Sequence, residues 1–195
     1  MTYSNKTPLG FQHLDSLTLG RPLMVVNHEG QTIGLCSKEE AHRIPLFHRA
    51  FSLLIFRGEF HEKSFLLQRR SFQKYHTGGL WSNTCCSHPW PEFSIEHCIS
   101  YRLFEEMGIK AQKEDFLYRG SINYNLPLGD LWENEWNHLY ELPWKNTYNI
   151  NINPQEVHEW IWMSPRDIIY KIQNNSKFFT PWFPLVFKFL HPEYF

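Results

Sequence analysis

A nearly continuous apolar run at residues 47–56 (FHRAFSLLIF) constrains the fold of this chain more than any other segment. An apolar run of this length predicts a strand that is buried inside a sheet. Residues 64–69 follow after a short polar interval and are expected to pair with this strand as a hairpin. Residues 23–26 and 31–36 flank the turn sequence Asn-His-Glu-Gly and predict a second hairpin.

Helices and further strands complete the predicted domain. We expect strands at 115–124, 131–142 and 157–163, and an amphipathic helix over 93–107 that ends at Gly108. Ser37 is expected to cap a short helical turn, Ser164-Pro165 to begin a helix and Thr180-Pro181 to open a final aromatic helix. Apolar residues recur at helical spacing in the 93–107 segment: Ile95, Cys98, Ile99, Leu103 and Met107. The pattern predicts a mixed α/β sandwich in a single unit.

Composition limits the class of protein. The 195 residues are 42% hydrophobic, which is enough for one domain, and residues 1–20 are expected to form a poorly patterned arm before a domain at 21–195. A formal net charge of −1 offers no overall field for nucleic acid or an anionic membrane. The four cysteines form no CxxC pair, and the chain has neither a secretory signal pattern nor a long apolar run, so we expect reduced thiols and a cytoplasmic location.

Residues 83–90 (NTCCSHPW) carry the most informative chemistry. They place the thiol of Cys86 two residues before the imidazole of His88, in what is expected to be a turn flanked by glycine and tryptophan. Cys85 and Cys86 must face opposite ways in an extended segment, so only one of them can share a pocket with His88. Nearby cations can lower the pKa of a thiol, although a free cysteine is often only a small buried apolar residue.

Histidines and acids elsewhere could form a metal site. His42 and His48 precede or begin the buried strand, and imidazole suits divalent zinc, manganese or iron. Glu133 and Glu135 occupy alternate positions, so on a strand both carboxylates enter one pocket, where a metal ion would relieve their repulsion. Taken singly, each of these residues is better explained as a satisfied core histidine or a solvated acid.

Cations follow the second predicted strand. Arg69, Arg70 and Lys74, with Lys38 as a further candidate, could hold phosphate oxygens, although most such clusters are solvated surface. Glu106, near the end of the predicted helix, could bind a hard cation such as magnesium or simply form a polar helix end.

Together these residues resemble type 1 isopentenyl-diphosphate isomerases, a family with a Nudix-like α/β/α sandwich and a mixed sheet. The resemblance extends from about Leu23 to the aromatic C-terminal segment, and three motifs occur in the family's order: 68–74 (QRRSFQK), 81–89 (WSNTCCSHP) and 132–135 (WENE). It implies an enzyme that interconverts isopentenyl and dimethylallyl diphosphate by moving a double bond.

The resemblance also implies roles for individual residues. The implied catalytic residues are Cys86, Glu135 and Tyr124. The implied ligands of a divalent manganese, zinc or magnesium ion are His42, His48, His88, Glu133 and Glu135. Glu106 would bind Mg²⁺ that bridges to the diphosphate, and the substrate would be contacted by Lys38, Arg70, Lys74 and Trp182.

The alternatives are a Nudix-type pyrophosphohydrolase and a non-catalytic module that binds a metal or a phospholipid head group. A Nudix hydrolase carries Arg-Glu where this chain has Tyr101-Arg102, which disfavours hydrolysis. The binding module would leave Cys86 and Glu135 without a role. The sequence does not define the ion at the histidine site or the oligomeric state.

Overall fold

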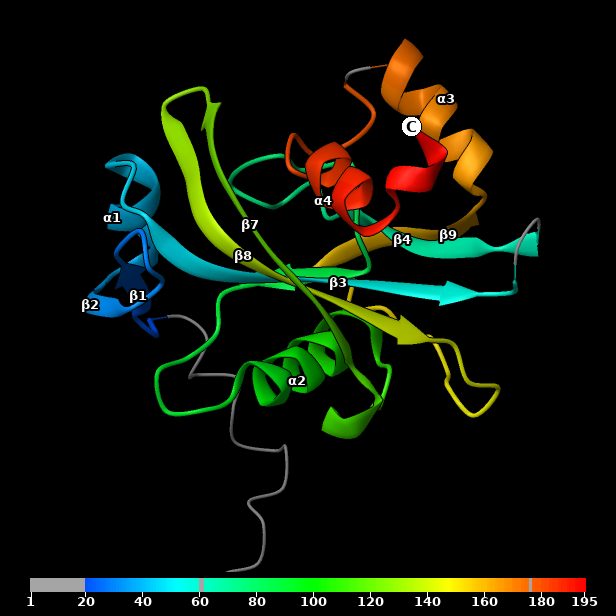
Figure 1. The fold of residues 1–195 in the computed structure, drawn as a ribbon, viewed down its shortest axis with the longest axis horizontal. Helices are drawn as coiled ribbons and strands as arrows, with labels where there is room; N and C mark the ends of the chain where they lie inside the picture. The colour runs from blue at the N-terminus through cyan, green and yellow to red at the C-terminus, as the bar shows by residue number, and fades with distance from the viewer. Residues whose placement is uncertain (1–19, 60–61, 176) are drawn as a thin grey trace, which may run out of the picture.

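Strand β3 (His48–Arg57) lies at the centre of a mixed sheet of nine strands (Figure 1). The computed structural model describes residues 20–59, 62–175 and 177–195. The expected arm at 1–20 therefore lies, apart from Gly20, outside the described residues. The other strands are β1 (Leu23–Val26), β2 (Thr32–Cys36), β4 (Ser64–Arg70), β5 (Trp81–Ser82), β6 (Cys85–Ser87), β7 (Leu117–Leu128), β8 (Leu131–Pro143) and β9 (Val157–Met163).

Strand β3 has neighbours on both edges along its length. It pairs antiparallel with β1, β4 and β6, and parallel with β8. The predicted hairpins β1–β2 and β3–β4 are confirmed, and β9 pairs with the other edge of β4. Strands β7 and β8 form a long hairpin that extends beyond the sheet centre. The parallel pairing of β3 with β8 makes the sheet mixed, as predicted.

Helices cover both faces of the sheet (Figure 1). Helix α2 (Ile95–Met107) packs on one face, where its apolar side contacts Phe51, Leu53 and Ile55 of β3. Helices α3 (Pro165–Asn174) and α4 (Phe183–Leu190) pack on the other face, over Leu54 and the apolar residues of β4. Neighbouring residues of β3 face opposite sides of the sheet, which explains why its apolar run is continuous. The α/β/α sandwich in one domain is confirmed.

The ends of the helices follow the chemistry of their caps. The hydroxyl of Ser94 accepts a hydrogen bond from the backbone of His97, so α2 begins after it, two residues later than predicted. Gly108 ends α2 in the left-handed conformation, and a Cβ there would lie 2.6 Å from the carbonyl oxygen of Asn151. The turn predicted after Ser37 is a complete short helix, α1 (Lys38–Arg43), capped by that serine.

The prediction of a turn around Cys86 was wrong in part. Residues Cys85–Ser87 form strand β6, in which Cys86 is the partner of Ser52 and Cys85 the partner of Leu53. The segment has no alternating polarity of its own. It is a strand because it pairs with β3. As expected for an extended segment, Cys85 enters the core under α2 while Cys86 faces the opposite side.

Candidate active site

The strand register gathers the predicted site on one face of the sheet. His48 on β3 is the partner of Glu135 on β8, and Ser52, four residues later, is the partner of Cys86 on β6. Paired residues on neighbouring strands point to the same side, so these groups share the face that carries α4. Glu133 lies two residues before Glu135 on β8 and points the same way.

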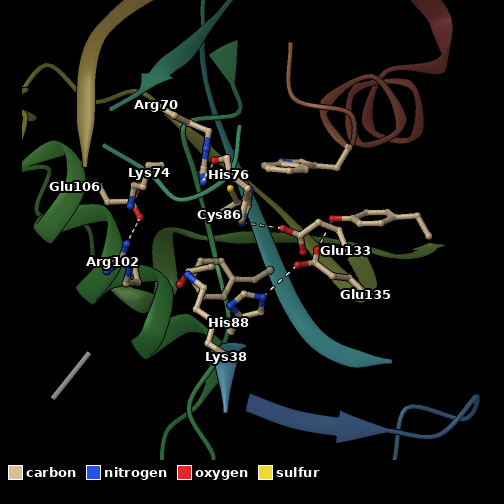
Figure 2. Close-up of a pocket in the computed structure, with 14 residues that line it drawn as sticks. Lys38, Arg70, Lys74, His76, Cys86, His88, Arg102, Glu106, Glu133 and Glu135 are labelled. Atoms are coloured by element: carbon tan, nitrogen blue, oxygen red, sulfur yellow. Dashed lines mark hydrogen bonds and ion pairs between the residues drawn. The ribbon is translucent and has the colours of Figure 1, made fainter. Parts of the chain in front are cut away.

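These side chains line one cavity (Figure 2). The predicted residues that line it are Lys38, Arg70, Lys74, Cys86, His88, Glu106, Tyr124, Glu133, Glu135 and Trp182. His42 and His48 are fully buried and contact its carboxylates. Four more residues lie in the wall, namely Phe51, His76, Ser87 and Arg102. All of the predicted site residues therefore meet at one place.

The Nε2 atoms of three imidazoles, those of His42, His48 and His88, converge on a common point. Nδ1 of His42 donates to the carbonyl of Lys38 at 2.6 Å, and Nδ1 of His48 donates to the carbonyl of Leu46 at 2.7 Å. Each neutral ring then has an unprotonated Nε2. Nε2 of His48 lies 3.2 Å from Nε2 of His88, so the two nitrogen atoms converge.

Glu133 completes this group. Its Oε2 lies 3.2 Å from Nε2 of His42, and neither atom has a hydrogen-bond partner among the described residues. The ligand atoms of His42, His48, His88 and Glu133 all lie within 4.8 Å of one another. Three nitrogens and a carboxylate oxygen suit a divalent transition metal, so the donor set fits the predicted ion.

Burial keeps two of the histidines neutral. Desolvation lowers the pKa of His48 to about 4, helped by its neighbour His88, and it lowers the pKa of His88 well below the usual value. For His42, burial also opposes protonation, but the close contact with Glu133 and the negative charge of that carboxylate outweigh it and raise the pKa. Neutral imidazole is the form that binds a metal.

Glu135 connects two groups of polar side chains. The first is the metal-type group, which consists of His42, His48, His88 and Glu133. Its Oε1 lies 3.2 Å from Nε2 of His88 and 3.8 Å from Nε2 of His48. Its Oε2 accepts a short hydrogen bond from the hydroxyl of Tyr124 and another from Asn137 at 3.2 Å. Burial and the charge of Glu135 raise the pKa of Tyr124 well above its usual value, so the phenol keeps its proton. One carboxylate thus faces histidines on one side and a protonated phenol on the other.

Cys86 is a protonated thiol in this cavity. Burial raises its pKa to about 11; the charge of Arg70 favours the thiolate, but three nearby glutamates oppose it together with the burial. Neighbouring cations therefore do not make a thiolate available here, because desolvation is the larger influence on the pKa of Cys86.

Two cations of the cavity, Lys38 and Arg70, have no acidic partner in the described part of the chain. Arg70 is 9% exposed, and its guanidinium makes only one long hydrogen bond, 3.5 Å to the carbonyl of His76. Burial, together with the charges of Lys74, Arg102 and Arg70, lowers the pKa of Lys38 to about 8. Neither Lys38 nor Arg70 forms an ion pair with a described carboxylate. Uncompensated cations in a cavity favour an anionic ligand.

Lys74 and Arg102 are paired instead. Both bind Glu156, and Arg102 also donates to Glu106 at 2.6 Å. The other oxygen of Glu106 accepts from Gln68 at 2.8 Å. Each carboxylate oxygen retains a further lone pair, so Glu106 can still meet a hard cation at the cavity wall.

Trp182 forms the apolar wall. It is 4% exposed, precedes α4 and lies over the cavity with the guanidinium of Arg70 5.5 Å from its ring centre. Its indole nitrogen has no hydrogen-bond partner among the described residues. The aromatic face and the adjacent cations give the cavity one apolar end and one anion-binding end.

Sequence reasoning missed two ionisable residues of the wall, His76 and Arg102, together with Phe51 and Ser87. His76 lies in the irregular segment between β4 and β5, where no periodic pattern indicates the direction of a side chain. Arg102 was considered only as a departure from the hydrolase motif. Its position one helical turn before Glu106 was the signal that could have placed it in the cavity.

Comparison with known proteins defines the class first. The NUDIX domain family model matches residues 46–183, which is more than half of the chain. The DR0079 protein of Deinococcus radiodurans superposes with a TM-score of 0.64 at 14% identity, covering 85% of this chain and 96% of that one. The MutT protein of Methanosarcina mazei gives a TM-score of 0.56 at 18% identity, covering 75% and 94%. Fold and site therefore define a Nudix-domain protein.

Comparison with curated relatives identifies the family within the Nudix-domain proteins. The isopentenyl-diphosphate Delta-isomerase of Photobacterium profundum is 35% identical over 176 residues, covering 88% of this chain and 94% of the relative. That of Aliivibrio fischeri strain MJ11 is 39% identical over 170 residues, covering 85% and 92%. The chain belongs to the isopentenyl-diphosphate Delta-isomerase family.

Proposed function

We propose that this cavity interconverts isopentenyl diphosphate and dimethylallyl diphosphate. The observation that carries the proposal is the placement of Cys86 and Glu135 on the wall of one cavity, together with the cations Lys38 and Arg70 (Figure 2). Trp182 lines the same cavity. The family membership supports the same substrate, since the relatives are named for this reaction.

The reaction needs proton exchange at two carbon atoms. An alkene is a weak base, so a positioned acid must deliver a proton to its terminal carbon. The electron pair of the double bond forms the new C–H bond and leaves a tertiary carbocation. Loss of a proton from the neighbouring methylene returns the electron pair to a new double bond. Cys86 and the Glu135–Tyr124 pair are the proton-exchanging groups that we assign to these steps.

The walls of the cavity suit the cationic intermediate. The face of Trp182 can stabilise a carbocation by about 2 kcal/mol when water is excluded. The aromatic ring also keeps water away from the cation, which water would otherwise trap. Lys38, Arg70 and Lys74 would hold the diphosphate at the opposite end through charge-assisted hydrogen bonds.

Two divalent ions belong to the proposal. His42, His48, His88, Glu133 and Glu135 would hold manganese, zinc or magnesium, and Glu106 would bind Mg²⁺ together with the diphosphate. The first ion, when bound, offsets the negative charge of the two carboxylates and limits the motion of Glu135. The protein residues then orient the substrate and exchange protons with it.

The proposed setting is the cytoplasm, with a small isoprenoid diphosphate as the ligand. All four cysteines are free, in keeping with a reducing compartment. No helix in the described part of the chain is both long enough and apolar enough to cross a lipid bilayer.

Proton NMR of the purified protein with isopentenyl diphosphate, Mn²⁺ and Mg²⁺ tests the proposal. We expect dimethylallyl diphosphate to accumulate to an equilibrium mixture without release of phosphate. Hydrolysis of nucleoside diphosphates, with no shift of the double bond in isopentenyl diphosphate, would instead establish a pyrophosphohydrolase.

A further inference from the structure

His76 occupies an unusual place for a residue in an irregular segment. It lies between β4 and β5, yet only 7% of its side chain is exposed and its ring lines the cavity (Figure 2). The ring stacks on the ring of His42, with 5.7 Å between the ring centroids. It also meets the ring of Trp182 edge-on, with 6.1 Å between the centroids. His76 therefore fills the space between the metal-type group and the apolar wall.

The contact of His76 with Glu133 is specific. Nε2 of His76 lies 3.2 Å from Oε1 of Glu133, while the other oxygen, Oε2, faces His42 at the same distance. The ligand atoms that converge within 4.8 Å include Glu133 but not His76. The imidazole thus contacts the carboxylate from outside the group that would surround an ion.

The neighbouring threonine favours one arrangement of protons. A carboxylate only accepts hydrogen bonds, so a hydrogen bond at this contact places the proton of His76 on Nε2. Nδ1 lies 3.0 Å from the hydroxyl of Thr77, which can donate to it when the ring is neutral. Thr77 has a φ of 50°, a conformation that a β-branched residue adopts only when its surroundings impose it.

The backbone around His76 is also closely packed. A Cβ at Gly78 would lie 3.0 Å from the carbonyl oxygen of Phe72, and Gly79 donates to the carbonyl of Arg70 at 3.0 Å. These contacts hold the segment against the start of β5 and leave the imidazole little freedom. A hydrogen bond from a fixed donor orients a carboxylate better than one from a mobile side chain.

We propose that His76 is a positioning residue for the metal site, in which its Nε2–H holds Oε1 of Glu133 so that Oε2 points at the ion. The inference rests on the proposed function, in which Glu133 is a metal ligand. His76 neither binds the ion nor touches the substrate in this role. Loss of such an outer partner of a metal ligand typically lowers metal affinity about 10–100-fold.

Calorimetric titration of the full chain with Mn²⁺ tests the inference. We expect His76→Ala to weaken binding about 10–100-fold without changing the number of ions bound. His76→Gln, whose amide nitrogen reaches about as far as Nε2, should stay within about threefold of the wild type, whereas His76→Asn, whose amide is too short, should resemble alanine. His97→Ala removes an exposed histidine of α2 and should leave the affinity unchanged.

Kinetics separate positioning from a general effect on folding. The activity lost in His76→Ala should return as the Mn²⁺ concentration is raised, because only the occupancy of the site is reduced. Equal Mn²⁺ affinity in His76→Ala and the wild type overturns the inference, and so does equal affinity of the glutamine and asparagine variants. A wild-type chain that binds no Mn²⁺ contradicts the metal site itself, an outcome distinct from a failure of His76 alone.

Discussion

Nε2 of His48 and Nε2 of His88 lie 3.2 Å apart, although the two residues are 40 positions apart in the sequence. Hydrogen bonding to the Leu46 carbonyl fixes the tautomer of His48, which leaves its Nε2 as an acceptor. A cation between the two Nε2 atoms would stabilise this contact when His88 carries its proton on Nδ1. The start of β3 and the residue after β6 therefore bring together two nitrogen atoms that an ion would stabilise.

Metal binding should raise the thermal stability of the wild type. At an Mn²⁺ concentration about 100 times the dissociation constant, the stabilisation is about 2.7 kcal/mol, which corresponds to an increase in Tm of about 5–10 °C for a domain of this size. Differential scanning calorimetry with and without a chelator measures this shift. His88→Ala should abolish it, whereas His97→Ala should retain it; an unchanged Tm in the wild type would contradict the site.

Removal of Arg70 should weaken the binding of diphosphate. A charge-assisted hydrogen bond contributes about 1.5–3 kcal/mol, so Arg70→Ala should lower the affinity for inorganic pyrophosphate about 10–150-fold. Competitive inhibition of the isomerase reaction by pyrophosphate gives the inhibition constant, which measures this affinity. Arg69→Ala is the matched control, because Arg69 pairs at the surface with Glu159 at 2.7 Å. A loss as large as that of Arg70→Ala in this control would refute the assignment of the anion site.

Trp182 should affect the chemical step more than substrate binding. If its ring stabilises the carbocation by about 2 kcal/mol, Trp182→Leu should lower kcat about 30-fold. Trp182→Phe keeps an aromatic face and should lose less. Steady-state kinetics with thermal unfolding of each variant separate this effect from a loss of stability. Similar kcat values for the leucine and phenylalanine variants would argue against a role for the π system.

A buried ion pair beneath α4 should make stability depend on pH. Burial disfavours the charge of Glu141, but contacts with His191 at 3.1 Å and with Arg119 at 2.7 Å outweigh it and lower the pKa of this carboxyl below its usual 4.5. A lowered native pKa adds stability above pH 4.5, and that stability is lost as the pH falls through the native pKa. Glu141→Gln should therefore cost about 1–3 kcal/mol at pH 7 and progressively less below pH 4.5. Urea unfolding over this range measures the difference; a constant difference would show that the charge is irrelevant.

Long-range pairing explains what the sequence could and could not predict. The strand at 47–56 was recognisable because its own apolar run is buried on both faces, and the observed β3 is displaced by only one residue. Strand β6 has three residues, and only its pairing with β3 makes it extended. The β7–β8 hairpin is longer than predicted because pairing continues through residues 125–128, which lack a strand pattern of their own.

The site residues also divide into those that a local pattern predicts and those that depend on long-range contacts. Glu133 and Glu135 were placed together correctly, since alternation along a strand is a local rule. His76 reaches Glu133 from 57 positions away, and no spacing in the sequence indicates that approach. The protonated state of Cys86 could not be predicted either, because it depends on how completely the folded chain excludes water.

Deuterium exchange during turnover tests the central claim most directly. In D₂O the wild type should incorporate deuterium into isopentenyl and dimethylallyl diphosphate, which NMR detects at each carbon. Cys86→Ala and Glu135→Gln should remain folded and lose activity about 10²–10⁴-fold or more, without exchange. Normal deuterium incorporation by either variant would contradict the assignment of Cys86 and Glu135 as the two proton-exchanging groups.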